Sequence, residues 1–105
     1  MDLGGRYRHL GGDETKMSIE ETLKERESRY GSFKRHSRIA QNIQTAMADG
    51  NWSDLSSDKR EALQMIAHKI ARILNGDQNY ADNWHDIAGY AILVEDIIND
   101  KTKAI

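Results

Sequence analysis

The chain has 105 residues, no cysteine and no proline, with 15 lysine and arginine residues against 17 aspartate and glutamate residues. This length allows one domain at most. The absence of cysteine excludes a disulfide framework and a cysteine-ligated zinc site. A general nucleic-acid-binding protein would carry a positive excess rather than a net charge of −2. No apolar run reaches the roughly 18 residues of a membrane span. From the net charge and the absence of such a run, we expect neither nucleic acid nor membrane as a partner.

The two ends of the chain differ in composition from its middle. Residues 1–16 contain two Gly-Gly pairs and few apolar side chains, which predicts a flexible tail or a leader added upstream of Met17. Residues 17–100 carry the helical patterns and form the single expected domain. Residues 101–105 are expected to fray.

Two helices are predicted in the first half of the chain. Ser18 and Glu21 have the three-residue spacing of a capping box, which predicts a short polar helix over residues 19–29 that ends at Gly31. Residues 33–48 place apolar side chains at helical spacing, so one face of this second helix is expected to be buried. That face comprises Phe33, His36, Ile39, Ala40, Ile43 and Met47.

Two longer helices are predicted in the second half. The third begins at the expected N-cap Ser57 and carries a broad apolar stripe until Asn75 and Gly76, which stop it. The fourth is predicted over residues 82–99, with Asp82 as the favoured N-cap and Trp84 as a core anchor. Stripes this wide exceed what one small core can cover. We therefore predict an all-α fold, a small four-helix bundle completed by self-association as a homodimer or higher homo-oligomer.

Side chains that can carry chemistry gather where the third and fourth helices meet at their turn. Lys69 and Arg72 share one helix face, and Asp82 and Asp86 share another. A short turn makes the two helices antiparallel neighbours, so these groups are expected to converge at one end of the hairpin. The predicted ligand-binding residues are Lys69, Arg72, Asn79, Tyr80, Asp82, Asn83 and Asp86.

Two roles stay open for each of these charged groups. The cations Lys69 and Arg72 either hold phosphate oxygens or form salt bridges with the carboxylates opposite. The carboxylates Asp82 and Asp86 either hold a ligand group, namely Mg²⁺ or a sugar hydroxyl, or cap the helix and pair with the cations. Tyr80 is the predicted stacking partner of a nucleobase, because an aromatic residue in a turn is not needed by the core.

Other catalytic patterns do not occur in the sequence. No serine lies in a nucleophile elbow, and no glycine-rich loop of the Walker type is present. His36, His68 and His85 lie on three different predicted helices without the spacing of a metal site. Structural roles are therefore predicted for the three histidines.

Three sequence blocks resemble a family of small uncharacterised proteins encoded by tailed bacteriophages and prophages. The similarity extends over about residues 24–98, with the blocks in the same order. The blocks are Arg26-x-x-x-Tyr30-Gly31 followed by Phe33, His36, Ile39 and Ala40, then the run from Arg60 to Leu74, and then the run from Asn75 to Tyr90. This resemblance implies a phage-encoded protein that works in the cytoplasm of the bacterial host.

The chain is also similar in outline to the MazG-like all-α nucleoside triphosphate pyrophosphohydrolases. In that group one helix with Glu-Glu-x-x-Glu and another with Glu-x-x-Asp bind magnesium. Asp86 and Tyr90 match the Asp-x-x-x-Tyr end of the second motif, and Asn83 stands where that motif has Glu. The preceding helix has His68 and Lys69 where acidic ligands are expected, so the motif is incomplete. The resemblance implies Mg²⁺ as the cofactor if the protein is an enzyme.

Two functions follow as hypotheses. In the first, the protein binds, and if active hydrolyses, a nucleotide or another phosphate-bearing small molecule through the hairpin residues. In the second, a phage uses it as a non-enzymatic inhibitor of a host defence or regulatory protein, or as a sponge that sequesters a nucleotide signal. An open cavity shared by Lys69, Arg72, Asp82 and Asp86 would favour the first hypothesis.

Overall fold

The structure, a computed structural model, describes residues 18–100. Within this range the chain forms the helices α2 (Ile19–Tyr30), α3 (Phe33–Met47), α4 (Ser57–Asn75) and α5 (Ala81–Ile98), and the short 3-10 helix η1 (Trp52–Asp54). The predicted all-α fold with four helices is confirmed. None of these helices has the length and apolar composition that a membrane crossing requires. The predictions for residues 1–16 and 101–105 lie outside the described range.

Local capping chemistry sets both ends of α2. The Ser18 hydroxyl accepts from the backbone N–H of Glu21 at 3.1 Å, and the Glu21 carboxylate accepts from the backbone N–H of Ser18 at 3.3 Å. The predicted capping box is therefore confirmed. Gly31 ends the helix with φ +77° and ψ −173°. A residue with a side chain rarely adopts that φ value.

The starts of α4 and α5 differ from the prediction by one or two residues. Ser56, and not Ser57, is the N-cap of α4. Tyr80 is the N-cap of α5, so Asp82 lies inside the first turn of the helix. The predicted caps Ser57 and Asp82 are therefore wrong. A carboxylate in the first turn still interacts favourably with the positive end of the helix.

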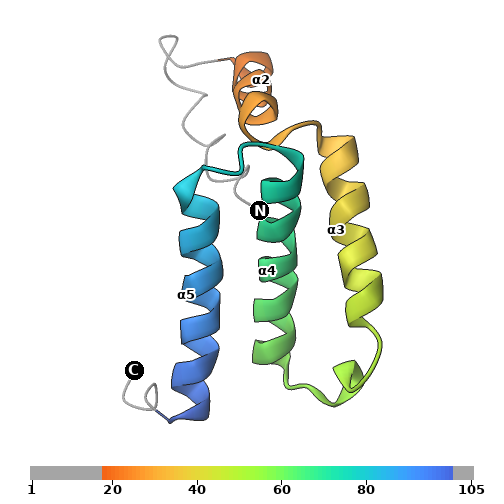
Figure 1. Cartoon of the computed structure of the whole chain (residues 1–105), viewed down its shortest axis with the longest axis vertical. Coiled ribbons are helices and arrows are strands. Elements are labelled where there is room, and N and C mark those ends of the chain that lie inside the picture. Colours follow the sequence, from red (N-terminus) through yellow and green to blue (C-terminus); the bar gives the residue numbers. More distant parts are fainter. Residues whose placement is uncertain (1–17, 101–105) are drawn as a thin grey trace.

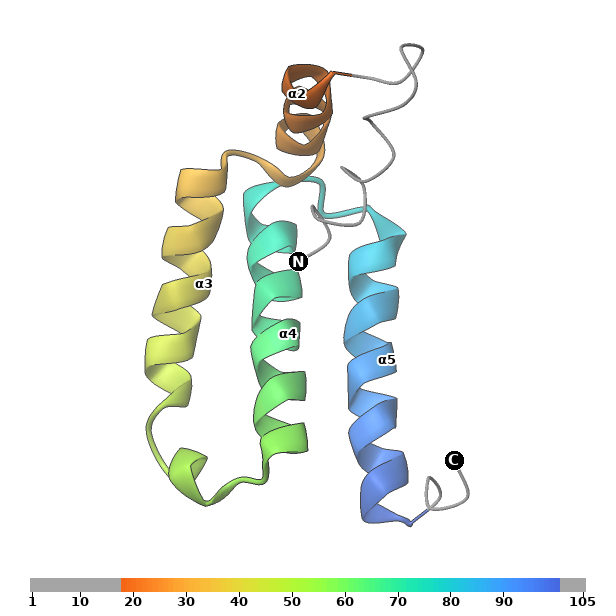
Figure 2. The same cartoon turned by 180° about the vertical axis from the view of Figure 1, so that it is seen from behind.

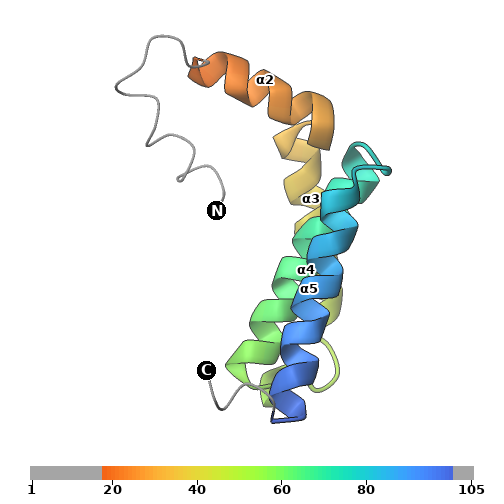
Figure 3. The ribbon, with the colours of Figure 1, turned by 90° about the vertical axis from the view of Figure 1, so that its left-hand side faces the viewer.

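Three helices lie side by side in a single layer (Figure 1). The central helix, α4, has α3 and α5 as antiparallel neighbours on its two sides, and the view from behind shows the same order (Figure 2). Seen from the edge, only α2 projects from this layer among the described helices (Figure 3). The side from which α2 projects is called the front face below, and the other side the back face.

The core of the described chain consists of small side chains. The buried apolar residues are Ala40, Ala62, Ala67 and Ala71. No leucine, isoleucine, phenylalanine or tryptophan in residues 18–100 is buried, although these types are often the most buried in compact domains. Phe33 and Trp84 are 70% and 55% exposed, so the predicted burial of both is wrong. A single layer covers only the sides of each helix that meet a neighbour.

Candidate functional site

Hydrogen bonds join the end of α2 to the turn between α4 and α5. The side-chain amide of Asn75 donates to the carbonyl oxygens of Tyr30 and Ser32, at 2.9 and 2.8 Å. The backbone N–H of Asp77 donates to the carbonyl oxygen of Arg29 at 2.9 Å. These bonds connect residues more than 40 positions apart, and they hold α2 in place over one end of the layer.

Two glycines allow the backbones to approach closely at this junction. A Cβ atom on Gly31 would clash with the backbone and side chain of Asn75. A Cβ atom on Gly76 would clash with the backbones of Arg29 and Tyr30. Both glycines belong to the sequence blocks identified above, and the junction gives a packing reason for their presence.

An open cavity of about 890 Å³ lies between α2, α3 and α4 on the front face. Small-molecule sites in proteins commonly measure roughly 300–1,000 Å³. The charged side chains that line the cavity are Glu20, Lys24, Arg26, Glu27, Lys69 and Arg72. Apolar and aromatic side chains, Leu23 and Met65 among them, form much of the remaining wall.

The charges of the lining favour an anionic ligand. Four of the six charged side chains are cations, whereas the whole chain has a net charge of −2. Lys69 is 6% exposed, and its Nζ lies 3.0 Å from Oδ2 of Asp86. This salt bridge neutralises the charge of Lys69, one of the four cations. The guanidinium carbons of Arg26 and Arg72 lie 5.0 and 4.6 Å from the ring centroid of Tyr30. Cation–π contacts with this ring therefore hold two arginines at the cavity.

Three rings form a stacked row along the cavity wall. The ring centroids of Phe33 and His36 are 6.3 Å apart, and those of His36 and His68 are 5.8 Å apart. Phe33 is 70% exposed, so the row ends at a ring that a flat aromatic ligand can reach. Sequence reasoning assigned the two histidines to structure and Phe33 to the core. Phe33 and His36 stand in the same sequence block as Arg26 and Tyr30, and this was the signal that the sequence analysis missed.

Burial affects the protonation of the central ring in this row. The pKa of His36 is lowered from its ordinary value of 6.5, first because burial disfavours the charged imidazole, and then because Arg72 and His68 add positive charge. The Nδ1 atom of His36 is buried and has no hydrogen-bond partner among the described residues. The neutral imidazole is therefore favoured in the folded chain.

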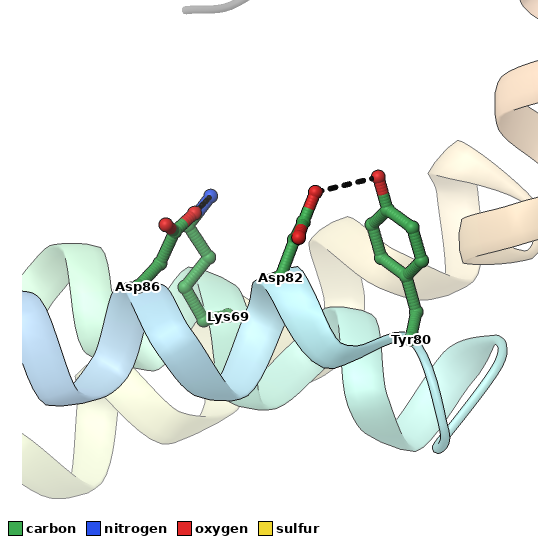
Figure 4. A network of polar contacts seen from close by, with 4 residues as sticks. All are labelled: Lys69, Tyr80, Asp82 and Asp86. Carbon is green, nitrogen blue, oxygen red and sulfur yellow. Dashed lines mark hydrogen bonds and ion pairs between the residues drawn. The ribbon is translucent and has the colours of Figure 1, made fainter.

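The predicted site residues are brought together only in part. Lys69 and Arg72 line the cavity, as the hypothesis of a shared cavity requires. Asp82 and Asp86 do not line it, although both project from the same side of α5, Asp86 beside Lys69 and Asp82 toward Tyr80 (Figure 4). The salt bridge between Lys69 and Asp86 realises one of the alternatives left open by the sequence.

Tyr80 and Asp82 bind each other at the start of α5. The Tyr80 hydroxyl donates to Oδ2 of Asp82 at 2.9 Å, and this bond is the main reason why the pKa of Tyr80 is raised above 10.0 (Figure 4). The guanidinium carbon of Arg29 lies 4.6 Å from the ring centroid of Tyr80, and the ring of Tyr30 meets it edge-on at 6.1 Å. Neighbouring side chains of the junction therefore already contact the ring that was predicted to stack on a base.

The two predicted asparagines have other roles. The backbone N–H of Asn79 donates to Oδ1 of Asp77 at 2.9 Å, which shapes the turn. Asn83 is 2% exposed, and its Nδ2 atom has no hydrogen-bond partner in residues 18–100. Neither asparagine lines the cavity.

The predicted metal ligands do not form a metal site by themselves. Within the described part of the chain, no group of three or more histidine, cysteine or acidic side chains is arranged to hold a metal ion. The ammonium group of Lys69 already neutralises Asp86, and Asp82 accepts the hydroxyl of Tyr80. These two carboxylates therefore do not fit a preformed Mg²⁺ site.

Comparison with protein families places the site in a known group. Residues 16–98 match the family described as a domain of unknown function (DUF6378). The chain belongs to this family. Comparison with curated proteins and with solved structures found no match. The matched segment of this family contains the whole junction and every residue that lines the cavity.

Proposed function

We propose that the protein binds a phosphate-bearing small molecule, with nucleotides as the leading class, in the cavity between α2, α3 and α4. The supporting observation is that cations and a row of aromatic rings line the same cavity. Guanidinium groups bind phosphate oxygens through paired hydrogen bonds, which suits Arg72 and Arg26 to the phosphate. A nucleobase stacks on an exposed aromatic ring, which suits Phe33 to the base.

This binding mode keeps part of the sequence-based hypothesis and changes the rest. Arg72 retains the phosphate role that was predicted for it, whereas Lys69 is paired with Asp86. Phe33 takes the base-stacking role that was predicted for Tyr80, because the ring of Tyr80 is in contact with Arg29 and Tyr30. The apolar wall of the cavity lowers the local dielectric, which strengthens each charge interaction with the ligand.

Isothermal titration calorimetry with nucleoside triphosphates and cyclic nucleotides, with and without Mg²⁺, tests this function. We expect binding by the unmodified chain and a loss of affinity of about tenfold or more in Arg72→Gln, because a phosphate contact is removed. The matched control is Arg38→Gln, an exposed arginine of α3 outside the cavity lining, which should change the affinity less than about twofold. An equal loss in both variants, or no binding across the panel, would contradict the proposed site.

Binding and turnover are separate questions, and the same experiment distinguishes them. Analysis of the nucleotide recovered after incubation shows whether it has been cleaved. Release of pyrophosphate would support the activity that the MazG-like resemblance implies. Recovery of the intact nucleotide after tight binding would support a sponge that sequesters a nucleotide signal.

Binding of a host bacterial protein is the second candidate function. Helix α2 has no buried residue, and it exposes 51% of Ile19 and 47% of Leu23 among charged side chains. Exposed apolar residues within a polar surface are typical of protein contacts. A stoichiometric partner recovered from bacterial lysate by the unmodified chain, and lost with Ile19→Glu, would support this function. Retention of the same partner by that variant would argue against α2 as the contact.

A further inference from the structure

Two histidines stack on each other in the wall of the cavity. The rings of His36 on α3 and His68 on α4 are nearly parallel, with 21° between their planes and 5.8 Å between their centroids. Both side chains are half-buried, and both line the cavity. The binding mode proposed above uses arginines and the ring of Phe33, so it leaves the titratable nitrogens of this histidine pair without a role.

Charged side chains from α2 and α4 share the cavity with the histidine pair. Helix α4 contributes the cations Lys69 and Arg72. Helix α2 contributes charged and titratable side chains of both signs, namely Glu20, Lys24, Arg26, Glu27 and Tyr30. Helix α3 contains no acidic residue, and its cations Lys34, Arg35 and Arg38 are exposed and outside the lining.

The described chain gives the pair no anionic partner. The carboxylates of the lining belong to Glu20 and Glu27, and neither forms an ion pair with an imidazole within residues 18–100. The charges that act on His36 are those of Arg72 and His68, which together with burial lower its pKa below 6.5. The Nδ1 atom of His36 is buried without a hydrogen-bond partner in the same range. An anion supplied by a ligand would therefore be the first partner of an imidazolium at this position.

We propose that the pair of His36 and His68 is a proton-binding part of the ligand site, which selects phosphates with two or more negative charges over phosphates with one. This inference rests on the proposed function. An anion in the cavity offsets the charge of Arg72 and attracts positive charge onto the imidazoles, and both effects grow with the charge of the anion. A multiply charged phosphate therefore binds together with a proton from the solvent. The resulting imidazolium donates a charge-assisted hydrogen bond to a phosphate oxygen.

The distance between the two rings limits the pair to one proton. Two imidazolium rings 5.8 Å apart repel each other, so the first proton hinders the binding of a second. Because binding and protonation are linked, uptake of one proton tightens binding by up to about tenfold for each pH unit by which the pH is lowered. The cavity would thus distinguish a triphosphate from a cyclic phosphate by charge, in addition to any difference in shape.

Isothermal titration calorimetry in two buffers of different ionisation enthalpy measures this proton uptake. The probes are adenosine triphosphate, with several phosphate charges, and cyclic adenosine monophosphate, with one. The unmodified chain is compared with the double variant His36→Gln and His68→Gln. The terminal phosphate of the triphosphate itself titrates at about pH 6, and the comparison removes this contribution because it is common to both chains.

At about pH 7 we expect the unmodified chain to take up about half a proton more per bound triphosphate than the double variant. Its affinity advantage over that variant should grow about threefold or more between about pH 8 and about pH 7. With the cyclic nucleotide, the difference in proton uptake should be less than about 0.2. The matched control is His85→Gln, an exposed histidine of α5 outside the cavity lining, which should behave as the unmodified chain does.

The possible failures are distinguishable. Triphosphate binding with equal proton uptake in the unmodified chain and the double variant would overturn the role of the pair and leave the proposed function standing. The same difference in uptake for both nucleotides would overturn selection by charge. Absence of nucleotide binding at every pH would overturn the proposed function, and this inference with it.

Nuclear magnetic resonance provides a test that leaves the cavity unaltered. The chain has four histidines, and their ring proton signals can be assigned with single glutamine variants and followed against pH. Saturation of the unmodified chain with adenosine triphosphate should move the titration midpoint of His36 or of His68 to higher pH. Midpoints that stay in place for both rings while the nucleotide is bound would overturn the inference, even if the double variant failed to fold.

Discussion

At the scale of single residues, Asn75 does most to position α2. Its amide donates to two carbonyl oxygens, those of Tyr30 and Ser32, which lack this donor if the side chain is removed. We expect Asn75→Ala to lower the free energy of unfolding by about 1–3 kcal/mol, measured by urea denaturation. Asn42→Ala, at an exposed position of α3, is the control and should stay within about 0.5 kcal/mol. Equal stabilities of the two variants would show that the junction contributes little.

His36 makes the stability of the fold depend on pH in the range where a histidine titrates. Burial, Arg72 and His68 lower its pKa in the folded chain below 6.5. The unfolded chain therefore binds more protons in this range, so stability is full above about pH 6.5 and falls as the pH decreases through the folded-state pKa. We expect His36→Gln to reduce the loss of thermal stability between about pH 7 and about pH 5. His85 is exposed, and His85→Gln is the control that should leave this loss of thermal stability unchanged. If the two variants lose the same thermal stability, His36 is not the cause of the loss.

At the scale of the elements, local sequence signals determine most of the fold. The capping box at Ser18 and the stop at Asn75 act within a few residues, so the helices could be placed within one or two positions. Burial was harder, because helical spacing shows which side chains share a face but not whether another element covers that face. Phe33 and Trp84 share faces with apolar neighbours and are nevertheless exposed.

The candidate site was predictable only where one helix supplies it. Lys69 and Arg72 were found because they lie three residues apart on α4. The other cavity residues could not be assigned from spacing, because the position of α2 depends on contacts between Asn75 and residues more than 40 positions away. The sequence likewise gave no sign that Tyr80 and Asp82 would bind each other.

Gly89 tests whether α5 needs a glycine in its interior. No heavy atom lies within 4 Å of the position that a Cβ would take there. We expect Gly89→Ala to raise the free energy of unfolding by about 0.5–1 kcal/mol, because alanine loses less backbone entropy in a helix. Gly31→Ala is the opposite case and should destabilise the chain, since φ is +77° and Asn75 blocks the added methyl group. A destabilised Gly89→Ala variant would indicate that a partner contacts this part of α5.

At the scale of the whole molecule, the two faces of one layer differ in chemistry. The front face joins α2 to the layer and surrounds a cavity with arginines, histidines and aromatic rings. The back face exposes Leu74, Trp84 and Ile98, and it also carries the charged side chain of Glu95 at the same helical spacing on α5. A protein whose layer is one helix thick exposes both sides of that layer, and the proposed ligand site lies on the front face.

Ligand binding predicts a stabilising effect that depends on the cavity. A ligand at about 100 times its dissociation constant adds about 2.7 kcal/mol to the free energy of unfolding. We expect Arg72→Gln to abolish this effect and Arg38→Gln, outside the cavity lining, to retain it. Thermal unfolding of both variants across a range of nucleotide concentrations measures the effect. If Arg38→Gln removed it as well, the ligand would bind elsewhere than in the cavity.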